Sequence, residues 1–326
     1  MGGLKPYPVI LIHGLLLTSY AWLVMGPQRS LGYLLAEAGF DVWMMNLRGA
    51  SVSKMHTTIP ECTDEFWDFS WHEMGMYDLP AVIDYILATT KTEKVDVIGF
   101  SLGTNLMVVM ASTRPEYNGK VNVLHLIAPS IIFTKLMPKL EMVAQVITSD
   151  FVRTLVFGNI KEIGVSTMSR LTSTVLCKLP IVYQLCAAFA SEVYGLQPEK
   201  HSEELLTKYL EHHPDRTSTK TLIHLAQVAL SGYLHQFDMG EDNWRVYGQE
   251  RPPAYNLSAI TAKVRIYYSE FDESVDTEGV LKFADSLPSV IGIDVRKHFR
   301  HQDYIFPLDE HVEQYHQILR NLRDDR

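Results

Sequence analysis

The sequence predicts an α/β fold, with a mostly parallel sheet, helices on both of its faces and a helical cap inserted into the core. Short apolar runs alternate with helix-like segments through the first half of the 326-residue chain, which is typical of strand–helix units that feed a parallel sheet. This alternation stops near residue 130 and resumes near residue 264. A Gly-x-Ser-x-Gly sequence also joins one predicted strand to one predicted helix.

Each element is predicted from its local pattern. Strands are expected where short apolar runs end at turn residues, and helices where apolar residues recur at helical spacing. The expected strands cover residues 9–12, 40–45, 94–98, 121–127, 264–268 and 290–295, and the expected helices cover residues 30–38, 71–88, 102–112, 277–287 and 309–322.

The segment from about residue 130 to residue 248 has Met- and Leu-rich helical stretches and few strand signals. We interpret it as an insertion into one core, and we expect core at residues 1–129 and 249–326 and a helical cap with a lid at residues 130–248. Within it, residues 167–191 are dense in apolar side chains and form the candidate lid.

Composition excludes several classes of protein. Hydrophobic residues make up 47% and charged residues 21%, as in ordinary globular chains. The net charge is -9 and no basic stripe is present, so nucleic acid is not expected as a partner. The apolar stretch over residues 9–17 is interrupted by His13 and Gly14 and is too short to cross a bilayer, so no transmembrane segment is expected.

Ser101 is the candidate nucleophile. It stands in Gly99-Phe-Ser-Leu-Gly103, after a predicted strand and before a predicted helix. A strand that turns abruptly into a helix strains its elbow residue and lifts that side chain above the sheet, while flanking glycines let chain segments pass closely. The alternative, a glycine-rich turn with a capping serine, explains the motif but not its place between these two elements.

A serine hydroxyl becomes a good nucleophile when a base removes its proton and a third group orients that base. On this scaffold the base follows the acid in the chain, and the histidines after the last predicted strand are His298, His301, His311 and His316. We favour His301, which lies in a loop, and keep His298 in reserve. His311 and His316 fall within the predicted terminal helix and are interpreted as solvated.

The candidate acid follows the strand over residues 264–268. That segment offers Glu270, Asp272, Glu273 and Asp276. We favour Asp272, because a short side chain just beyond a strand end can meet an imidazole nitrogen. Without the chain order of the triad, a solvated acidic turn would explain all four carboxylates.

The transition state also needs donors for an oxyanion. One is expected to be the backbone N–H of Leu102, the residue after the nucleophile, and the other a backbone N–H of the loop His13-Gly-Leu15 that follows the first strand. His13 would then brace this loop.

The chain as a whole resembles the acid lipase family of α/β-hydrolases, which includes the gastric and lysosomal acid lipases. The most specific matches are Phe66-Trp67 and Tyr77-Asp-Leu-Pro80, and the resemblance also runs through residues 8–16, 41–43, 46–49, 65–74, 99–103 and 128–129. It implies an α/β-hydrolase fold, the triad Ser101, Asp272 and His301, and oxyanion donors at Leu15 and Leu102.

The resemblance implies further properties. Cys177 and Cys186 match a spacing that forms a lid disulfide in gastric lipase, and Asn256-Leu-Ser258 matches a glycosylation sequence there. The family location would be secreted or lysosomal. Counted alone, three cysteines are too few for a disulfide scaffold and leave the redox compartment open.

Two features depart from the family pattern. The family elbow usually reads Gly-His-Ser-Gln-Gly, and Phe100 and Leu102 replace its His and Gln here. Main-chain donors survive this exchange. The family also begins with a secretion signal and a stretch of about fifty residues that forms the first strands, so the chain resembles an amino-terminally shortened form in which the strand over residues 40–45 has an unpaired outer side.

The leading hypothesis is a serine carboxylic ester hydrolase that cleaves neutral lipid esters, such as triacylglycerols or steryl esters, at a lipid–water interface through an acyl-enzyme. A serine thioesterase or exopeptidase fits the same triad, and a catalytically silent lipid-binding protein is the alternative from another class. No His-Glu-x-x-His zinc motif is present, and the side chains of the adjacent pair His212-His213 would diverge on a helix and could not easily share a metal. No cofactor or metal is expected.

Overall fold

A computed structural model of the chain describes residues 7–164, 183–185, 187–188, 191 and 196–325. Its centre is a six-stranded sheet in the order β2-β1-β3-β4-β7-β8, and every strand pair in it is parallel. The strands are β1 (Pro8–Ile12), β2 (Asp41–Met45), β3 (Val95–Phe100), β4 (Val121–Ile127), β7 (Lys263–Ser269) and β8 (Val290–Arg296). The predicted α/β fold with a parallel sheet is confirmed.

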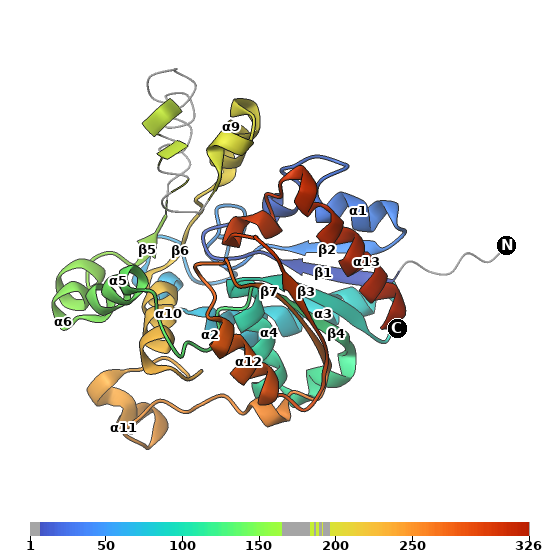
Figure 1. Cartoon of the computed structure of the whole chain (residues 1–326). Helices are drawn as coiled ribbons and strands as arrows, with labels where there is room; N and C mark the ends of the chain where they lie inside the picture. Colours follow the sequence, from blue (N-terminus) through green and yellow to red (C-terminus); the bar gives the residue numbers. More distant parts are fainter. Residues whose placement is uncertain (1–6, 165–182, 186, 189–190, 192–195, 326) are drawn as a thin grey trace.

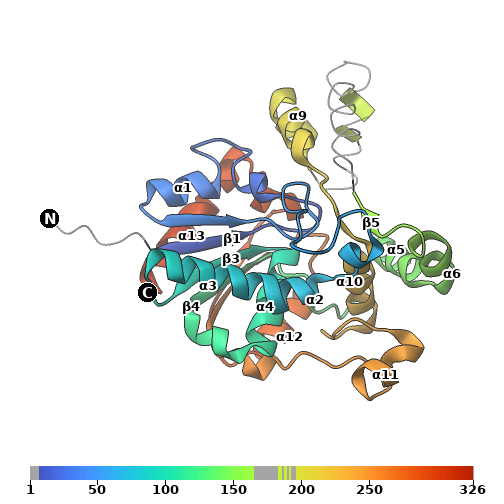
Figure 2. The same cartoon turned by 180° about the vertical axis from the view of Figure 1, so that it is seen from behind.

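Helices cover both faces of the sheet (Figures 1 and 2). One face carries α1 (Leu31–Glu37) and α13 (Glu313–Asp324), and the other carries α3 (Leu79–Thr90), α4 (Leu102–Thr113) and α12 (Thr277–Asp285). With both faces covered, the central strands β1 and β3 are buried at every position, which explains their continuous apolar runs in the sequence.

The expected helix over residues 71–88 differs in its first turns. The structure has a short α2 (Trp71–Glu73), a π-helical turn η3 (Met74–Asp78) and then α3. Pro80 has no N–H to donate to the carbonyl oxygen of Met76, and Arg114 Nη1 donates to that oxygen instead, at 3.1 Å. The regular helical spacing in the sequence does not reveal this extra residue in the turn.

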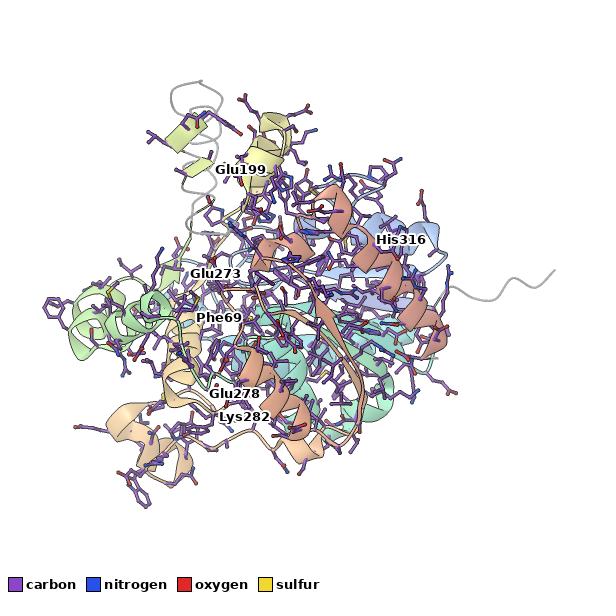
Figure 3. The ribbon with its side chains drawn as sticks, in the orientation of Figure 1. Phe69, Glu199, Glu273, Glu278, Lys282 and His316 are labelled. Carbon is purple, nitrogen blue, oxygen red and sulfur yellow. The ribbon has the colours of Figure 1, made fainter. Side chains whose placement is uncertain are left out.

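The terminal helix also differs from expectation. A 3-10 turn η10 (Asp309–His311) precedes α13. The interpretation of His311 as a solvated helix residue is wrong, because its side chain is buried and its ring lies 4.1 Å, centroid to centroid, from that of Phe299. His316 is exposed, on the outer face of α13 (Figure 3).

The described residues between β4 and β7 contribute no strand to the main sheet. They include α5 (Pro138–Thr148), α6 (Asp150–Val152), η5 (Arg153–Phe157), a small antiparallel sheet of β5 (Glu162–Ile163) and β6 (Thr217–Ser218), α9 (Glu203–His212), α10 (Thr219–Ser231) and α11 (Asn243–Tyr247). No helix in the described part of the chain is long and apolar enough to cross a membrane.

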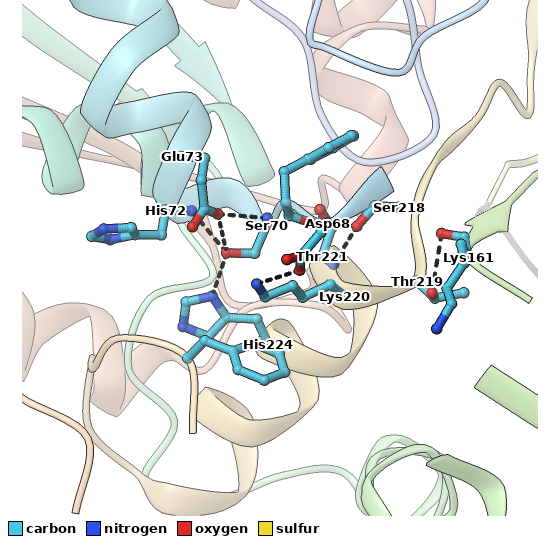
Figure 4. Close-up of polar contacts among 12 residues, drawn as sticks. Asp68, Ser70, His72, Glu73, Lys161, Ser218, Thr219, Lys220, Thr221 and His224 are labelled. Carbon is cyan, nitrogen blue, oxygen red and sulfur yellow. Dashed lines mark hydrogen bonds and ion pairs between the residues drawn. The ribbon is translucent and has the colours of Figure 1, made fainter. Parts of the chain in front are cut away.

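Helix α10 is joined to the core by polar contacts with the segment that begins α2 (Figure 4). His224 Nδ1 lies 3.0 Å from the Ser70 hydroxyl, whose oxygen is 3.0 Å from Glu73 Oε2. Lys220 pairs with Asp68 at 2.7 Å. Ser70 and His224 are both completely buried, so this serine–histidine contact is closed to substrate and its position indicates a structural joint.

Gly75 tests how closely the π-helical turn packs on α4. A Cβ at this position would lie 2.6 Å from Val109 Cβ and 2.7 Å from the Leu106 carbonyl oxygen. We expect Gly75→Ala to lower the free energy of unfolding by about 2 kcal/mol, measured by denaturant titration. Gly119→Ala is the control, because a Cβ there meets nothing within 4 Å. Equal stability of the two variants would contradict this packing argument.

Candidate active site

Three candidate catalytic residues meet at the carboxyl edge of the sheet. Ser101 directly follows β3, Asp272 follows β7, and His301 lies in the turn η9 (His301–Tyr304) after β8. The carboxyl ends of parallel strands share one edge, so residues far apart in the chain converge there.

The three side chains form one continuous hydrogen-bonded chain. His301 Nε2 lies 2.8 Å from Ser101 Oγ, and His301 Nδ1 lies 2.8 Å and 3.1 Å from the two Asp272 carboxylate oxygens. A carboxylate accepts, so Nδ1 carries the proton and Nε2 is left to accept from the serine hydroxyl. The Asp272 side chain is buried and also accepts from the Ser274 N–H at 2.9 Å.

The nucleophile position is held in a strained backbone. Ser101 has φ 52° and ψ -119°. The neighbouring glycines permit this, because a Cβ on Gly103 would lie 2.7 Å from the Ile12 carbonyl oxygen and a Cβ on Gly99 would lie 2.4 Å from Met107 Sδ. The expected elbow is therefore present in the structure, with the serine hydroxyl directed to the histidine.

The segments expected to supply the two oxyanion donors both lie next to Ser101. Leu102 is the first residue of α4, where a backbone N–H has no acceptor within the helix. The loop that contains Leu15 runs close to the nucleophile, since a Cβ on Gly14 would lie 3.1 Å from Ser101 Cβ.

His13 links that loop to the segment after β2. Its Nε2 accepts from the Leu47 N–H at 3.2 Å, so its Nδ1 carries the proton and donates to the Gly14 carbonyl oxygen at 2.9 Å. Burial lowers the pKa of His13 to about 4, and the contact with Gly14 opposes that shift. The imidazole is neutral at pH 7, as this pair of contacts requires.

The other candidate acids lie elsewhere. The Asp276 carboxylate accepts from the backbone N–H and the hydroxyl of Thr134 at 2.5 and 2.7 Å and from Glu278 N–H at 3.2 Å, so it ties α12 to the segment after β4. Glu270 is exposed, and so is Glu273, which is labelled in Figure 3. The interpretation as a solvated acidic turn therefore fits Glu270 and Glu273. It is wrong for Asp272 and Asp276, whose carboxylates accept hydrogen bonds from other protein groups.

The reserve histidine does not join the hydrogen-bonded chain. His298 is exposed, and its ring lies 4.7 Å from that of Phe271, centroid to centroid. It occupies the left-handed backbone region with φ 63°.

Sequence analysis missed the residues that hold the turn around His301. Asp303 is buried and accepts from the Arg300 N–H at 2.8 Å. The neighbouring Gln302 accepts from the Tyr209 hydroxyl at 3.1 Å. An acidic residue two positions after the candidate base is the signal that could have identified Asp303, because acidic side chains near the start of a turn often accept from the N–H that precedes it.

A pocket of about 480 Å³ lies beside Asp272. Its walls come from the Asp272 loop and from the start of α5, and they include Phe133, Leu136, Met137, Leu140, Phe271 and Val275. Among the described residues, no group of three or more His, Cys, Asp or Glu side chains could hold a metal ion.

Sequence comparisons relate the chain to known hydrolases. A model of the alpha/beta hydrolase fold family matches residues 7–154. Lipase 1 of Drosophila melanogaster is 33% identical over 321 residues, which cover 97% of this chain and 71% of that protein. Lipase member N of Homo sapiens is 31% identical, over 96% of this chain and 79% of that protein. Gastric triacylglycerol lipase of Mus musculus is 30% identical, with the same two coverages.

Comparison with solved structures agrees on the fold. A soluble variant of monoglyceride lipase from Saccharomyces cerevisiae, in complex with a substrate analog, has a TM-score of 0.61 at 14% identity and covers 100% of this chain and 90% of its own. Monoacylglycerol lipase from Paleococcus ferrophilus has a TM-score of 0.54 at 18% identity, with coverages of 99% and 96%.

The buried His13 predicts a loss of stability in mild acid. Its pKa is about 4 in the folded protein against 6.5 ordinarily, so its contribution is complete above pH 6.5 and is lost as the pH falls towards 4. We expect the free energy of unfolding of the wild type to fall between about pH 7 and pH 5 by about 2 kcal/mol more than that of His13→Gln, in denaturant titrations. His316→Gln, at an exposed position, should keep the wild-type dependence. If His13→Gln kept it too, this assignment would be wrong.

Proposed function

The chain belongs to the acid lipase family of α/β-hydrolases, and from this premise we propose that it is a serine carboxylic ester hydrolase that cleaves neutral lipid esters. The observation that carries the proposal is the unbroken chain of hydrogen bonds from Ser101 through His301 to Asp272. This arrangement suits acyl transfer, because it pairs a hydroxyl with a base and the base with a buried carboxylate.

The proposed reaction has two halves. Ser101 Oγ attacks the ester carbonyl carbon while His301 Nε2 takes the hydroxyl proton, and the same imidazole then gives that proton to the departing alcohol. The remaining acyl-enzyme is resolved by water, which His301 activates in the same way. Asp272 stabilises the imidazolium that forms in each half, through the contact at Nδ1.

Negative charge on the carbonyl oxygen is stabilised by main-chain donors in this proposal. The N–H of Leu102 lies at the amino end of α4, where the helix dipole also favours an anion. The N–H of Leu15 is the second donor. Both donors are main-chain N–H groups, so they do not depend on which side chain is present. The replacement of the usual family His and Gln by Phe100 and Leu102 therefore leaves this part of the mechanism intact.

The preference for lipid is supported by exposed apolar side chains on the insertion. Helix α5 buries only Ala144, and large apolar residues from the start of α5 through η5 are between 38% and 70% exposed, which is unusual for a surface helix. They are Met137, Leu140, Met142, Val143, Val146, Phe151, Leu155, Val156 and Ile160. Met137 and Leu140 also line the pocket beside Asp272, so this apolar segment reaches the loop that carries the proposed acid.

We propose that residues 130–248 form the cap over a core of residues 1–129 and 249–326, and that triacylglycerols or steryl esters reach the site from a lipid–water interface. The candidate lid over residues 167–191 falls mostly outside the described residues, as do both cysteines of the proposed Cys177–Cys186 disulfide. No cofactor is part of the proposal.

A secreted or lysosomal location and glycosylation at Asn256 complete the proposal. The Asn256 side chain is exposed, and its Oδ1 accepts from the N–H and the hydroxyl of Ser258. Sugar attachment needs such an accessible asparagine. Among the described residues, Cys62 is a free, exposed cysteine.

The triad assignment predicts large losses of ester hydrolysis on single substitution. We expect Ser101→Ala, His301→Ala and Asp272→Asn each to lower kcat on a soluble ester by about 10⁴-fold, because each breaks the proton transfer that activates the serine. The control Glu273→Gln changes an exposed acid of the same loop and should keep wild-type kcat.

Covalent labelling of the same proteins distinguishes an enzyme from a catalytically silent lipid-binding protein. A fluorophosphonate should label the wild type at Ser101 and leave Ser101→Ala unlabelled. A wild type that binds lipid but is neither labelled nor active on a panel of acyl esters and aminoacyl amides would overturn the proposed function.

The apolar segment predicts a selective effect on emulsified substrate. Val146→Glu combined with Phe151→Glu should lower the rate on an emulsified triacylglycerol by about tenfold or more and leave the rate on a soluble ester within about twofold, because charge opposes contact with a neutral lipid surface. Leu281→Glu, on α12, is the control at another exposed apolar position. Equal losses on both substrates would count against this surface.

A further inference from the structure

The turn that carries His301 is closed by the side chain of Asp303. The Arg300 N–H donates to Asp303 Oδ2 at 2.8 Å, and the Asp303 N–H donates back to the Arg300 carbonyl oxygen at 3.1 Å. These two bonds bracket His301, which lies between the two residues. The position of the imidazole therefore depends on what the Asp303 carboxyl group accepts.

Two other parts of the molecule reach the same turn. From the insertion, the Gln197 amide nitrogen lies 3.4 Å and 3.5 Å from the two Asp303 carboxylate oxygens, and the Tyr209 hydroxyl donates to Gln302. From the carboxyl-terminal side, Gln314 Nε2 donates to the Asp303 carbonyl oxygen at 3.1 Å. Asp303 is thus a point where the insertion and the last helix both meet the turn of His301.

His311 provides an alternative partner for the Asp303 carboxyl group. Its side chain is buried, and its Nδ1 lies 3.6 Å from Asp303 Oδ2. Among the described residues this Nδ1 has no hydrogen-bond partner. A protonated Asp303 has one O–H that needs an acceptor, and this imidazole nitrogen can accept it, whereas the Gln197 amide N–H can only donate.

We propose that Asp303 is a positioning residue for His301, whose carboxylate form holds the turn between Arg300 and Gln197 and whose protonated form turns to His311. The proposal rests on the proposed function, because it concerns the base of that reaction. It makes the rate of ester cleavage depend on an acid that touches neither Ser101 nor the substrate.

The electrostatic surroundings place this change within an accessible pH range. Burial raises the pKa of Asp303 to about 6, and the Arg300 N–H, the Gln197 amide and the charges of Arg300 and Lys200 oppose that shift. Burial lowers the pKa of His311, which keeps its ring neutral and able to accept. The titratable and charged groups that face the pair are Arg300, Lys200, His201, Tyr304, Tyr315, His298 and Glu310.

The test compares kcat of the wild type and Asp303→Asn on a soluble ester across the pH range, with each value divided by the fraction labelled at Ser101 by a fluorophosphonate. The amide mimics a permanently protonated Asp303. We expect the wild type to be about tenfold faster at pH 8, where it holds the carboxylate, and within about twofold at pH 5, with KM unchanged.

A second variant and a control make the result decisive. Gln197→Met removes a donor that favours the carboxylate, so its kcat should fall below the wild-type value between about pH 6 and pH 7 and approach it at pH 8. Asp309→Asn changes an exposed acid of the next turn and should keep a constant ratio. A wild-type to Asp303→Asn ratio that stays constant with pH, or a Gln197→Met profile that follows the wild type, would overturn the proposal.

NMR signals of the His301 imidazole, followed across the pH range, keep the two proposals distinguishable. In the wild type these signals should report the change at Asp303 as an inflection near pH 6 that is absent in Asp303→Asn. A wild type without ester turnover or Ser101 labelling that still shows this inflection would refute the proposed function and leave the role of Asp303 intact. An active wild type without the inflection would refute only the role of Asp303.

Discussion

The contact between Gly103 and the carbonyl oxygen of Ile12 is the constraint on which the rest of the site depends. It lets α4 begin directly above the end of β1, and the chain between β3 and α4 must then turn within the single residue Ser101, at φ 52°. That turn places the hydroxyl at the edge where β7 and β8 also end. A larger residue at Gly99 or Gly103 would move α4 away from the sheet and separate the Ser101 hydroxyl from the His301 imidazole.

Much of this arrangement is readable from the sequence, for identifiable reasons. Strands that are buried on both faces appear in the sequence as continuous apolar runs, so they can be predicted from it. The elbow motif then marks the junction between one such strand and a helix. The choice of Asp272 rests on its place just past a strand end, and its contact with His301 is a fact of tertiary structure. The sequence alone leaves four carboxylates open, because a loop of this length can present any of them.

The parts that could not be predicted depend on neighbours that are remote in the chain. Helical spacing marks His311 as part of an amphipathic segment but does not reveal that Phe299 covers it. In the π-helical turn Arg114 donates to the Met76 carbonyl oxygen, to which Pro80 has no N–H to donate, and a periodic pattern in the sequence does not reveal that remote donor. Asp303 was missed for the same reason, since its burial results from the insertion and the last helix together.

The pairing of β4 with β7 brings Val123 beside Lys263, across the whole insertion. Ser101 therefore leaves the ribosome long before Asp272 and His301, which follow β7 and β8, and the sheet cannot be completed until β8 has been synthesised. Closing so long a loop is an entropic burden on the folding rate, and it leaves β4 without its neighbour in the meantime. During synthesis Ser101 is therefore present well before Asp272 and His301, and the three side chains can meet only after β7 and β8 have joined the sheet.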